Sequence, residues 1–140
     1  MLLIEMYVSS LQGPMEDTIS DFWMCVSEHK VSTIVMLTSL VEKGRVKCAQ
    51  YWPQSSSQPL VLASSKTMVS LVSTSQQDNL TIRQISLLNT DTEQEKIVTQ
   101  IQVQDWSDHS VPHSTAVLLN LIQVLQSLTS APTSLFSLVK

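Results

Sequence analysis

Residues 97–103 read Ile-Val-Thr-Gln-Ile-Gln-Val, and the alternation within them decides the fold class. Successive side chains of a β-strand point to opposite faces of a sheet, so alternating apolar and polar residues indicate a half-buried strand. One face would carry Ile97, Thr99, Ile101 and Val103, and the other Gln100, Gln102 and Gln104. The stretch therefore predicts a strand with one apolar and one polar face.

Helical periodicity occurs on both sides of this strand in the sequence. A first helix is predicted over 18–29, with Thr18 at the N-cap position and Asp21 in the first turn. A second helix is predicted to start at the cap residue Ser114 and to end before Pro132. The inward positions are Ile19, Phe22, Trp23 and Val26 in the first helix, and Val117, Leu118, Leu121, Ile122, Leu125 and Leu128 in the second.

Several shorter apolar stretches complete the pattern. Strands are predicted over 33–38, 46–52, 60–63, 68–72 and 80–87, with turns at 42–45, 75–79 and 89–95 and an exposed serine-rich loop at 54–58. Two helices around several strands indicate a mixed α/β layer structure, because each apolar face needs another element to cover it.

Composition excludes several classes of protein. The chain has 140 residues, the size of one small domain, and its net charge of −4 argues against nucleic acid as a partner. Two cysteines cannot make a disulfide scaffold or a four-thiolate zinc site. No suitable ligand spacing surrounds His29, His109 or His113, so we expect no metal site. Gly13 and Gly44 lie far apart, which excludes a glycine-rich phosphate loop.

The sequence also carries no clear membrane or secretion signal. Glu5 interrupts the apolar start of the chain, and no basic residue precedes it. No window approaches the roughly 18 apolar residues that a membrane-spanning helix needs. We therefore expect no membrane segment and a cytoplasmic location with reduced thiols.

Ordered blocks of sequence carry a family resemblance. They are Gln12-Gly13-Pro14 with Thr18 and Asp21-Phe22-Trp23, then Ile34-Val35-Met36-Leu37, then residues 42–53 (EKGRVKCAQYWP), then Arg83, Ile85 and Leu87, and finally residues 106–112 (WSDHSVP). In this order the chain resembles a protein tyrosine phosphatase catalytic domain, in a form similar to several non-receptor members. The resemblance divides the chain into a divergent segment 1–11, a partial phosphatase domain 12–128 and a divergent tail 129–140. It implies a partial tyrosine-phosphatase fold, with a twisted mixed sheet flanked by helices.

The resemblance implies a role for the segment around Trp106, which matches the mobile acid loop of the family. The aspartate at the position of Asp108 protonates the leaving tyrosyl oxygen and then helps to activate water. Here Ser107 replaces the usual proline and Ser110 the usual glycine, which changes the backbone freedom of the loop. Read without the family, Asp108 is a solvated loop aspartate.

Two more positions carry over from the family. In the family, the residue that matches Glu42 pairs with the arginine of the phosphate loop. The family residue that matches Lys47 lies close to the acid loop and the substrate. Read from this chain alone, residues 42–47 are a solvated charged turn. Phe22 and Trp23 are expected in the core.

The expected nucleophile is missing. Family chemistry needs a thiolate in a loop of histidine, cysteine, five residues and arginine, and neither Cys25 nor Cys48 has that context. We therefore expect a domain that is incomplete at both ends and inactive alone, with no cofactor. Its partners, once completed, would be phosphotyrosine-containing proteins. The alternative is a non-catalytic pseudophosphatase or protein-interaction module.

Overall fold

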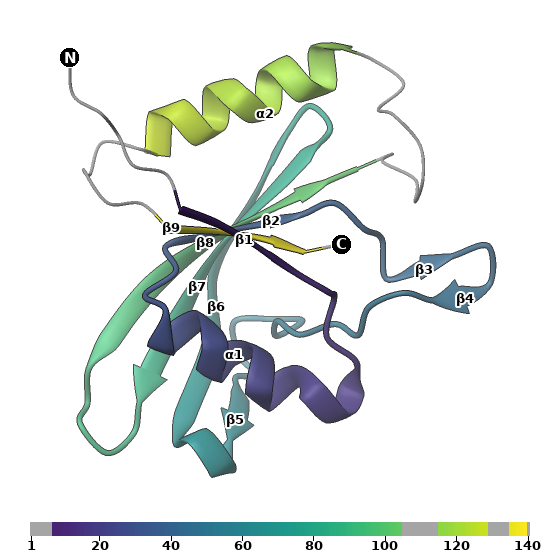
Figure 1. Cartoon of the computed structure of the whole chain (residues 1–140). Coiled ribbons are helices and arrows are strands. Elements are labelled where there is room, and N and C mark those ends of the chain that lie inside the picture. The colour runs from purple at the N-terminus through teal and green to yellow at the C-terminus, as the bar shows by residue number, and fades with distance from the viewer. Residues whose placement is uncertain (1–6, 105–114, 129–134, 140) are drawn as a thin grey trace.

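The computed structural model describes residues 7–104, 115–128 and 135–139. Its elements in chain order are β1 (Tyr7–Leu11), η1 (Glu16–Thr18), α1 (Ile19–Glu28), β2 (Thr33–Met36), β3 (Val41–Glu42), β4 (Arg45–Val46), β5 (Leu60–Leu62), η2 (Ala63–Ser65), β6 (Thr67–Gln77), β7 (Leu80–Asn89), β8 (Glu95–Val103), α2 (Thr115–Leu128) and β9 (Leu135–Val139). Figure 1 shows a strongly twisted sheet with one long helix on each side.

The main sheet has the strand order β1-β9-β2-β8-β7-β6-β5. Its first four strands run parallel to one another, and β8, β7, β6 and β5 pair antiparallel. The sheet is therefore mixed, which confirms the predicted α/β class. The strands β1 and β9 lie within the two segments that the sequence set apart as divergent, and both join this sheet.

Each face of the sheet packs against one helix (Figure 1). On one face, Phe22, Trp23 and Val26 of α1 are buried against the strands. On the other face, Val117, Leu121 and Val124 of α2 pack on a second, smaller core. Core positions for Phe22 and Trp23 are confirmed. None of the helices in the described part of the chain is long and apolar enough to cross a bilayer.

The polar and apolar faces predicted for the strand at 97–103 do not separate its exposed side chains from its buried ones. The Gln100 side chain is fully buried, whereas Ile97 is 48% exposed. The strand β8 lies between β2 and β7 and the sheet is covered on both faces, so both sets of alternating side chains enter a core near its middle.

Three other details differ from the sequence patterns. The strand predicted over 46–52 is wrong beyond β4, because the backbone turns away from the hairpin and the Ala49 N–H donates to the Pro14 carbonyl. The turn predicted over 75–79 is shorter, because β6 continues to Gln77. In α2 the inward stripe passes through Val124 and leaves Ile122 40% exposed.

Candidate functional site

Four strand ends meet at one edge of the sheet. The parallel register places Leu11 of β1 beside Val139 of β9, Val139 beside Met36 of β2, and Met36 beside Gln102 of β8. Ligands of open α/β sheets bind outside the carboxyl ends of the parallel strands. This edge is therefore the place where chemistry is expected.

The chain that leaves β2 at this edge forms the β3–β4 hairpin, which extends from the sheet in Figure 1. Its two-residue loop has positive φ at both Lys43 (51°) and Gly44 (75°), as a tight hairpin turn requires. Glu42 faces Arg45 across the hairpin. The turn predicted at 42–45 is confirmed, and Glu42 is half-buried rather than fully solvated.

Lys47 follows the hairpin and is anchored through its backbone. Its N–H donates to the Leu40 carbonyl at 2.8 Å, and two residues later Ala49 donates to the Pro14 carbonyl at 2.7 Å. Lys47 and Gln12 line one pocket of about 440 Å³ against α1. The structure thus brings together the segments that follow β1 and β2, which are far apart in sequence.

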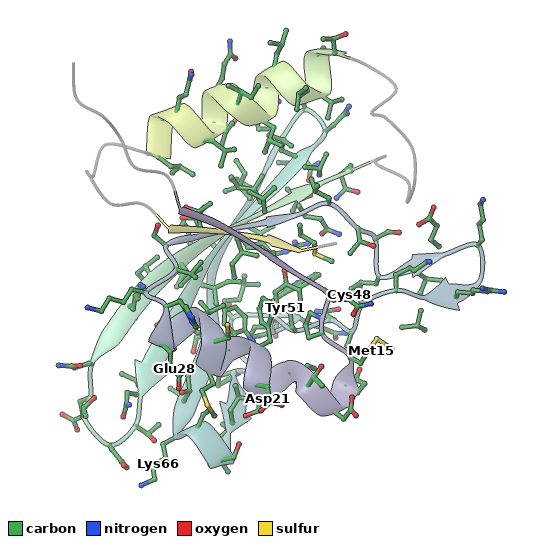
Figure 2. The ribbon with its side chains drawn as sticks, in the orientation of Figure 1. Met15, Asp21, Glu28, Cys48, Tyr51 and Lys66 are labelled. Carbon is green, nitrogen blue, oxygen red and sulfur yellow. The ribbon has the colours of Figure 1, made fainter. Side chains whose placement is uncertain are left out.

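A buried network holds the next part of this block. The Trp23 indole N–H donates to the Tyr51 carbonyl at 2.7 Å, and the Gln100 side-chain amide donates to the Tyr51 hydroxyl at 2.8 Å. Tyr51 is fully buried, which raises the pKa of its hydroxyl and keeps it protonated at neutral pH. Figure 2 shows Tyr51 in the layer between α1 and the sheet. The network connects the 48–52 segment to β8.

Arg83 of β7 extends this network. Its guanidinium donates to the Gln100 side-chain oxygen at 2.9 Å and to that of Gln102 at 3.0 Å, and it lies 4.4 Å from the centre of the Trp52 ring. Burial lowers the pKa of Arg83, but an arginine remains charged at neutral pH. The Arg83 side chain therefore connects β7, the Trp52 segment and the carboxyl-terminal half of β8.

Sequence reasoning missed these positioning residues. Alternation placed Gln100 on the polar face of its strand, and Tyr51 was predicted within a strand. The available signal was the segment 48–52, in which Cys48, Tyr51 and Trp52 lie close together in a chain with only 5% aromatics. Trp23 is the third aromatic residue of this group, and it donates to the Tyr51 carbonyl.

The two cysteines have different surroundings. Cys48 is buried, donates weakly to the Ala49 carbonyl at 3.2 Å, and has a pKa raised to about 11 by desolvation. A thiol in this state is not a nucleophile at neutral pH. Cys25 is partly exposed on α1, next to His29. In the described ranges, no three side chains of the metal-binding types converge on one point.

The remaining predicted site residues lie outside the described residues. These are Trp106 and Asp108 of the expected acid loop. His109 and His113, at which no metal site was expected, also lie outside the described residues. Their segment follows β8 in the chain, and β8 ends at the same sheet edge as β1, β2 and β9. Gln104, the last described residue before that segment, directly follows the end of β8.

Comparison with known proteins agrees with this architecture. The family model described as protein-tyrosine phosphatase matches residues 6–137. The chain is 40% identical over 115 residues to the human receptor-type tyrosine-protein phosphatase H, which covers 82% of this chain and 10% of that protein. It is 37% identical over 119 residues to the chicken receptor-type tyrosine-protein phosphatase eta, which covers 85% of this chain and 8% of that protein.

A relative that is not described as receptor-type matches to a similar extent. Tyrosine-protein phosphatase 1 of Caenorhabditis elegans is 38% identical over 110 residues, which cover 79% of this chain and 10% of that protein. The chain thus spans a tenth or less of the length of these relatives, and its resemblance to non-receptor members remains a prediction. The match over most of its residues shows that the chain belongs to the protein-tyrosine phosphatase family.

Proposed function

We propose that this chain supplies the acid-loop half of a site that hydrolyses phosphotyrosine in proteins. The observation that supports the proposal is the common edge formed by Leu11, Val139, Met36 and Gln102. In the chain, residues 42–47 come after β2 and Asp108 comes after β8, two of the strands that end at this edge. Residues 12–128 act as a partial phosphatase domain in this proposal, and the location is cytoplasmic.

The proposed chemistry assigns one role to each residue. Asp108 protonates the tyrosyl oxygen as the phosphorus–oxygen bond breaks, and later accepts a proton from the attacking water. Lys47 adds positive charge near the substrate, and Glu42 orients the arginine of the phosphate-binding loop. The thiolate that attacks phosphorus must come from a loop of histidine, cysteine, five residues and arginine.

The 140 residues contain no such loop, so we propose that the chain alone does not turn over substrate. The raised pKa of Cys48 supports this, because burial keeps that thiol protonated at neutral pH. Cys25 lies on α1 and lacks an arginine at the required spacing.

The test is to join the chain, after Val139, to the segment that follows the matched region in the human receptor-type relative. Hydrolysis of a phenyl phosphate and of a phosphotyrosine peptide is then measured for the chain and for the chimera. We expect no turnover by the chain and measurable turnover by the chimera. Asp108→Asn in the chimera should lower kcat by about 10²–10⁴-fold, the usual contribution of a general acid.

Asp91→Asn is the matched control, because Asp91 is an exposed acid that pairs with Lys66 far from this edge. It should leave kcat unchanged. Turnover by the unmodified chain that Cys25→Ser or Cys48→Ser abolishes would refute the proposed inactivity. An active chimera in which Asp108→Asn has no effect would refute the role of Asp108.

A non-catalytic role in protein interaction is the second candidate. It is favoured by three exposed apolar side chains on α2, namely Leu118 (38%), Leu119 (56%) and Ile122 (40%). Exposed apolar patches of this kind mark contact surfaces. A chimera that folds, as judged by circular dichroism, yet hydrolyses neither substrate would favour this role over catalysis.

A further inference from the structure

We propose that the outer edge of β6 is a self-association surface, to which a second copy of this chain adds its own β6 as an antiparallel strand. On one side β6 pairs with β7 from Thr67 to Gln77, with one irregularity at Val72. On the other side β5 pairs only with residues 67–69. Figure 1 shows β5 at the end of β6 that is opposite to the β6–β7 turn. The proposal does not rest on the phosphatase function.

The part of β6 beyond β5 is open to solvent. Residues 72–77 are all exposed, and Val72 is 56% exposed. Within the described ranges, β5 and β7 are the strands that pair with β6, so the outer backbone groups of residues 72–77 have no strand partner. A row of unpaired N–H and C=O groups is a template for the strand of another chain.

The β6–β7 turn determines which residues direct their backbone groups outward. Gln77 pairs with Leu80 across a two-residue loop, in which Asp78 has a φ of 52°. The residues that flank such a loop form a hydrogen-bonded pair, and hydrogen-bonded pairs alternate with non-hydrogen-bonded pairs along the strands. Thr74 and Gln76 therefore lie at positions whose N–H and C=O groups point away from β7.

These outward groups match those of a second copy. With Ser75 on a two-fold axis, Thr74 of one copy lies opposite Gln76 of the other, and each such pair exchanges two backbone hydrogen bonds. The same register places Ser75 opposite Ser75, and Ser73 opposite Gln77. A two-fold contact of this kind uses the open edge of both copies, so association stops at the dimer.

The side chains of β6 favour a second copy as the partner. Residues 67–77 contain no charged residue and no proline, although these are the usual protection of an edge strand. Serine, threonine and glutamine therefore meet across the axis without charge repulsion, and polar pairs of this kind stabilise neighbouring strands. A foreign peptide would draw its specificity from side-chain pockets along the edge. The pockets beside α1 include none of residues 72–77.

Sedimentation velocity of the 140-residue chain measures the association. A contact limited to residues 73–77 is much smaller than the interface of a stable complex, so we expect a reversible dimer at about 100 µM that dissociates at about 1 µM. A monomer at all concentrations in this range would overturn the proposal. Assemblies that grow beyond the dimer would also overturn it, because two-fold pairing leaves no open edge.

Thr74→Pro tests the edge itself. It removes an outward N–H and leaves the pairing with β7 in place, as proline does on edge strands. The dimer Kd should rise by about tenfold or more, because each copy loses one backbone bond to its partner. Thr74→Val keeps the N–H and is the matched control, which should dimerise as the unmodified chain does. Circular dichroism checks the folding of both variants, and unchanged dimerisation of folded Thr74→Pro would refute the role of this edge.

Substitutions at Ser75 test the two-fold symmetry without proline. Ser75→Lys alone and Ser75→Glu alone place like charges opposite each other, so each should raise the dimer Kd by about fivefold or more. An equal mixture of the two variants should form a heterodimer that is tighter than either homodimer. Ser56→Lys, in the exposed loop before β5, is the control and should leave Kd unchanged. The proposal fails if Ser75→Lys dimerises as the unmodified chain does, or if mixing the two variants restores nothing.

Discussion

Gln100 connects the buried Tyr51 hydroxyl with the half-buried Arg83 guanidinium, which also donates to Gln102. Its amide donates to the Tyr51 hydroxyl, and its oxygen accepts from Arg83. Leucine has a similar volume but can do neither. We expect Gln100→Leu to lower the free energy of unfolding by about 1–3 kcal/mol, because the buried Tyr51 hydroxyl loses its bond from Gln100 and Arg83 loses one of its two glutamine acceptors. Urea denaturation measures this loss.

Gln77 offers the matched substitution, since it is an exposed glutamine in a strand of the same sheet. Gln77→Leu should change stability by no more than about 0.5 kcal/mol. Equal losses in the two variants would mean that the Tyr51–Gln100–Arg83 network does not stabilise the fold.

Cys48 makes stability depend on pH on the alkaline side. Burial raises the pKa of its thiol from 9.0 to about 11 in the folded state. The folded state holds this proton more tightly than the unfolded state, so stability falls as pH rises from about 9 to about 11. The full difference is about 2.7 kcal/mol, from two pKa units.

Urea unfolding at about pH 8 and about pH 10 checks this prediction. The unmodified chain should lose stability between these values, and Cys48→Ala should lose less. Tyr51, whose pKa burial also raises, adds a similar decrease above about pH 10 in both proteins. If the unmodified chain and Cys48→Ala lost the same unfolding free energy between the two pH values, burial would not raise the pKa of Cys48.

At the scale of elements, the β3–β4 hairpin depends on the backbone of Gly44. Its φ of 75° is in the left-handed region, and a Cβ built there meets no atom within 4 Å. The cost of a side chain is therefore conformational rather than steric. Gly44→Ala should lower the free energy of unfolding by about 1–2 kcal/mol.

Asparagine adopts this conformation more easily than alanine, so Gly44→Asn should cost less. Thermal unfolding of the two variants gives the comparison. If alanine is tolerated better than asparagine, crowding rather than φ limits this turn.

Local patterns predicted the elements whose signals are local. Helical spacing predicted α1 and α2, and the β-branched and apolar run at 33–38 predicted β2, which ends at Met36. The strand prediction failed for residues 48–52. Their side chains are as apolar as those of a strand, but the Ala49 backbone N–H donates to the Pro14 carbonyl. The burial of Gln100 was not predicted, because alternation does not show that a second layer covers the polar face of the strand. Candidate site residues followed from the family blocks, and their placement needed the sheet register.

At the scale of the whole molecule, β9 joins two parts of the sheet. Ser137 lies between Ser9 of β1 and Ile34 of β2. Proline has no N–H and is not tolerated in the middle of a sheet. Ser137→Pro should therefore detach β1 and weaken β2, while the β6–β7 hairpin, which pairs elsewhere, remains folded.

Amide hydrogen exchange distinguishes these regions. Exchange should speed up in Tyr7–Leu11 and Thr33–Met36 of the Ser137→Pro variant, and stay slow in the β6–β7 pairing. Uniform acceleration over the whole chain would show instead that the sheet unfolds as one unit. The pairing of β9 with β1 and β2 is a contact between distant segments, which no periodicity in the sequence could predict.

The parallel pairing of β1 with β9 has a consequence for synthesis. Tyr7 is paired with Leu135, so the ribosome must add all the residues between these two positions before β1 has its neighbour. At about 5–20 residues per second, β1 waits on the order of ten seconds with its hydrogen-bonding edge unpaired. During that interval, chaperones that bind extended segments can bind the unpaired β1 of the nascent chain. The order of strands thus makes β1, the first strand of this sheet to be synthesised, one of the last to be paired.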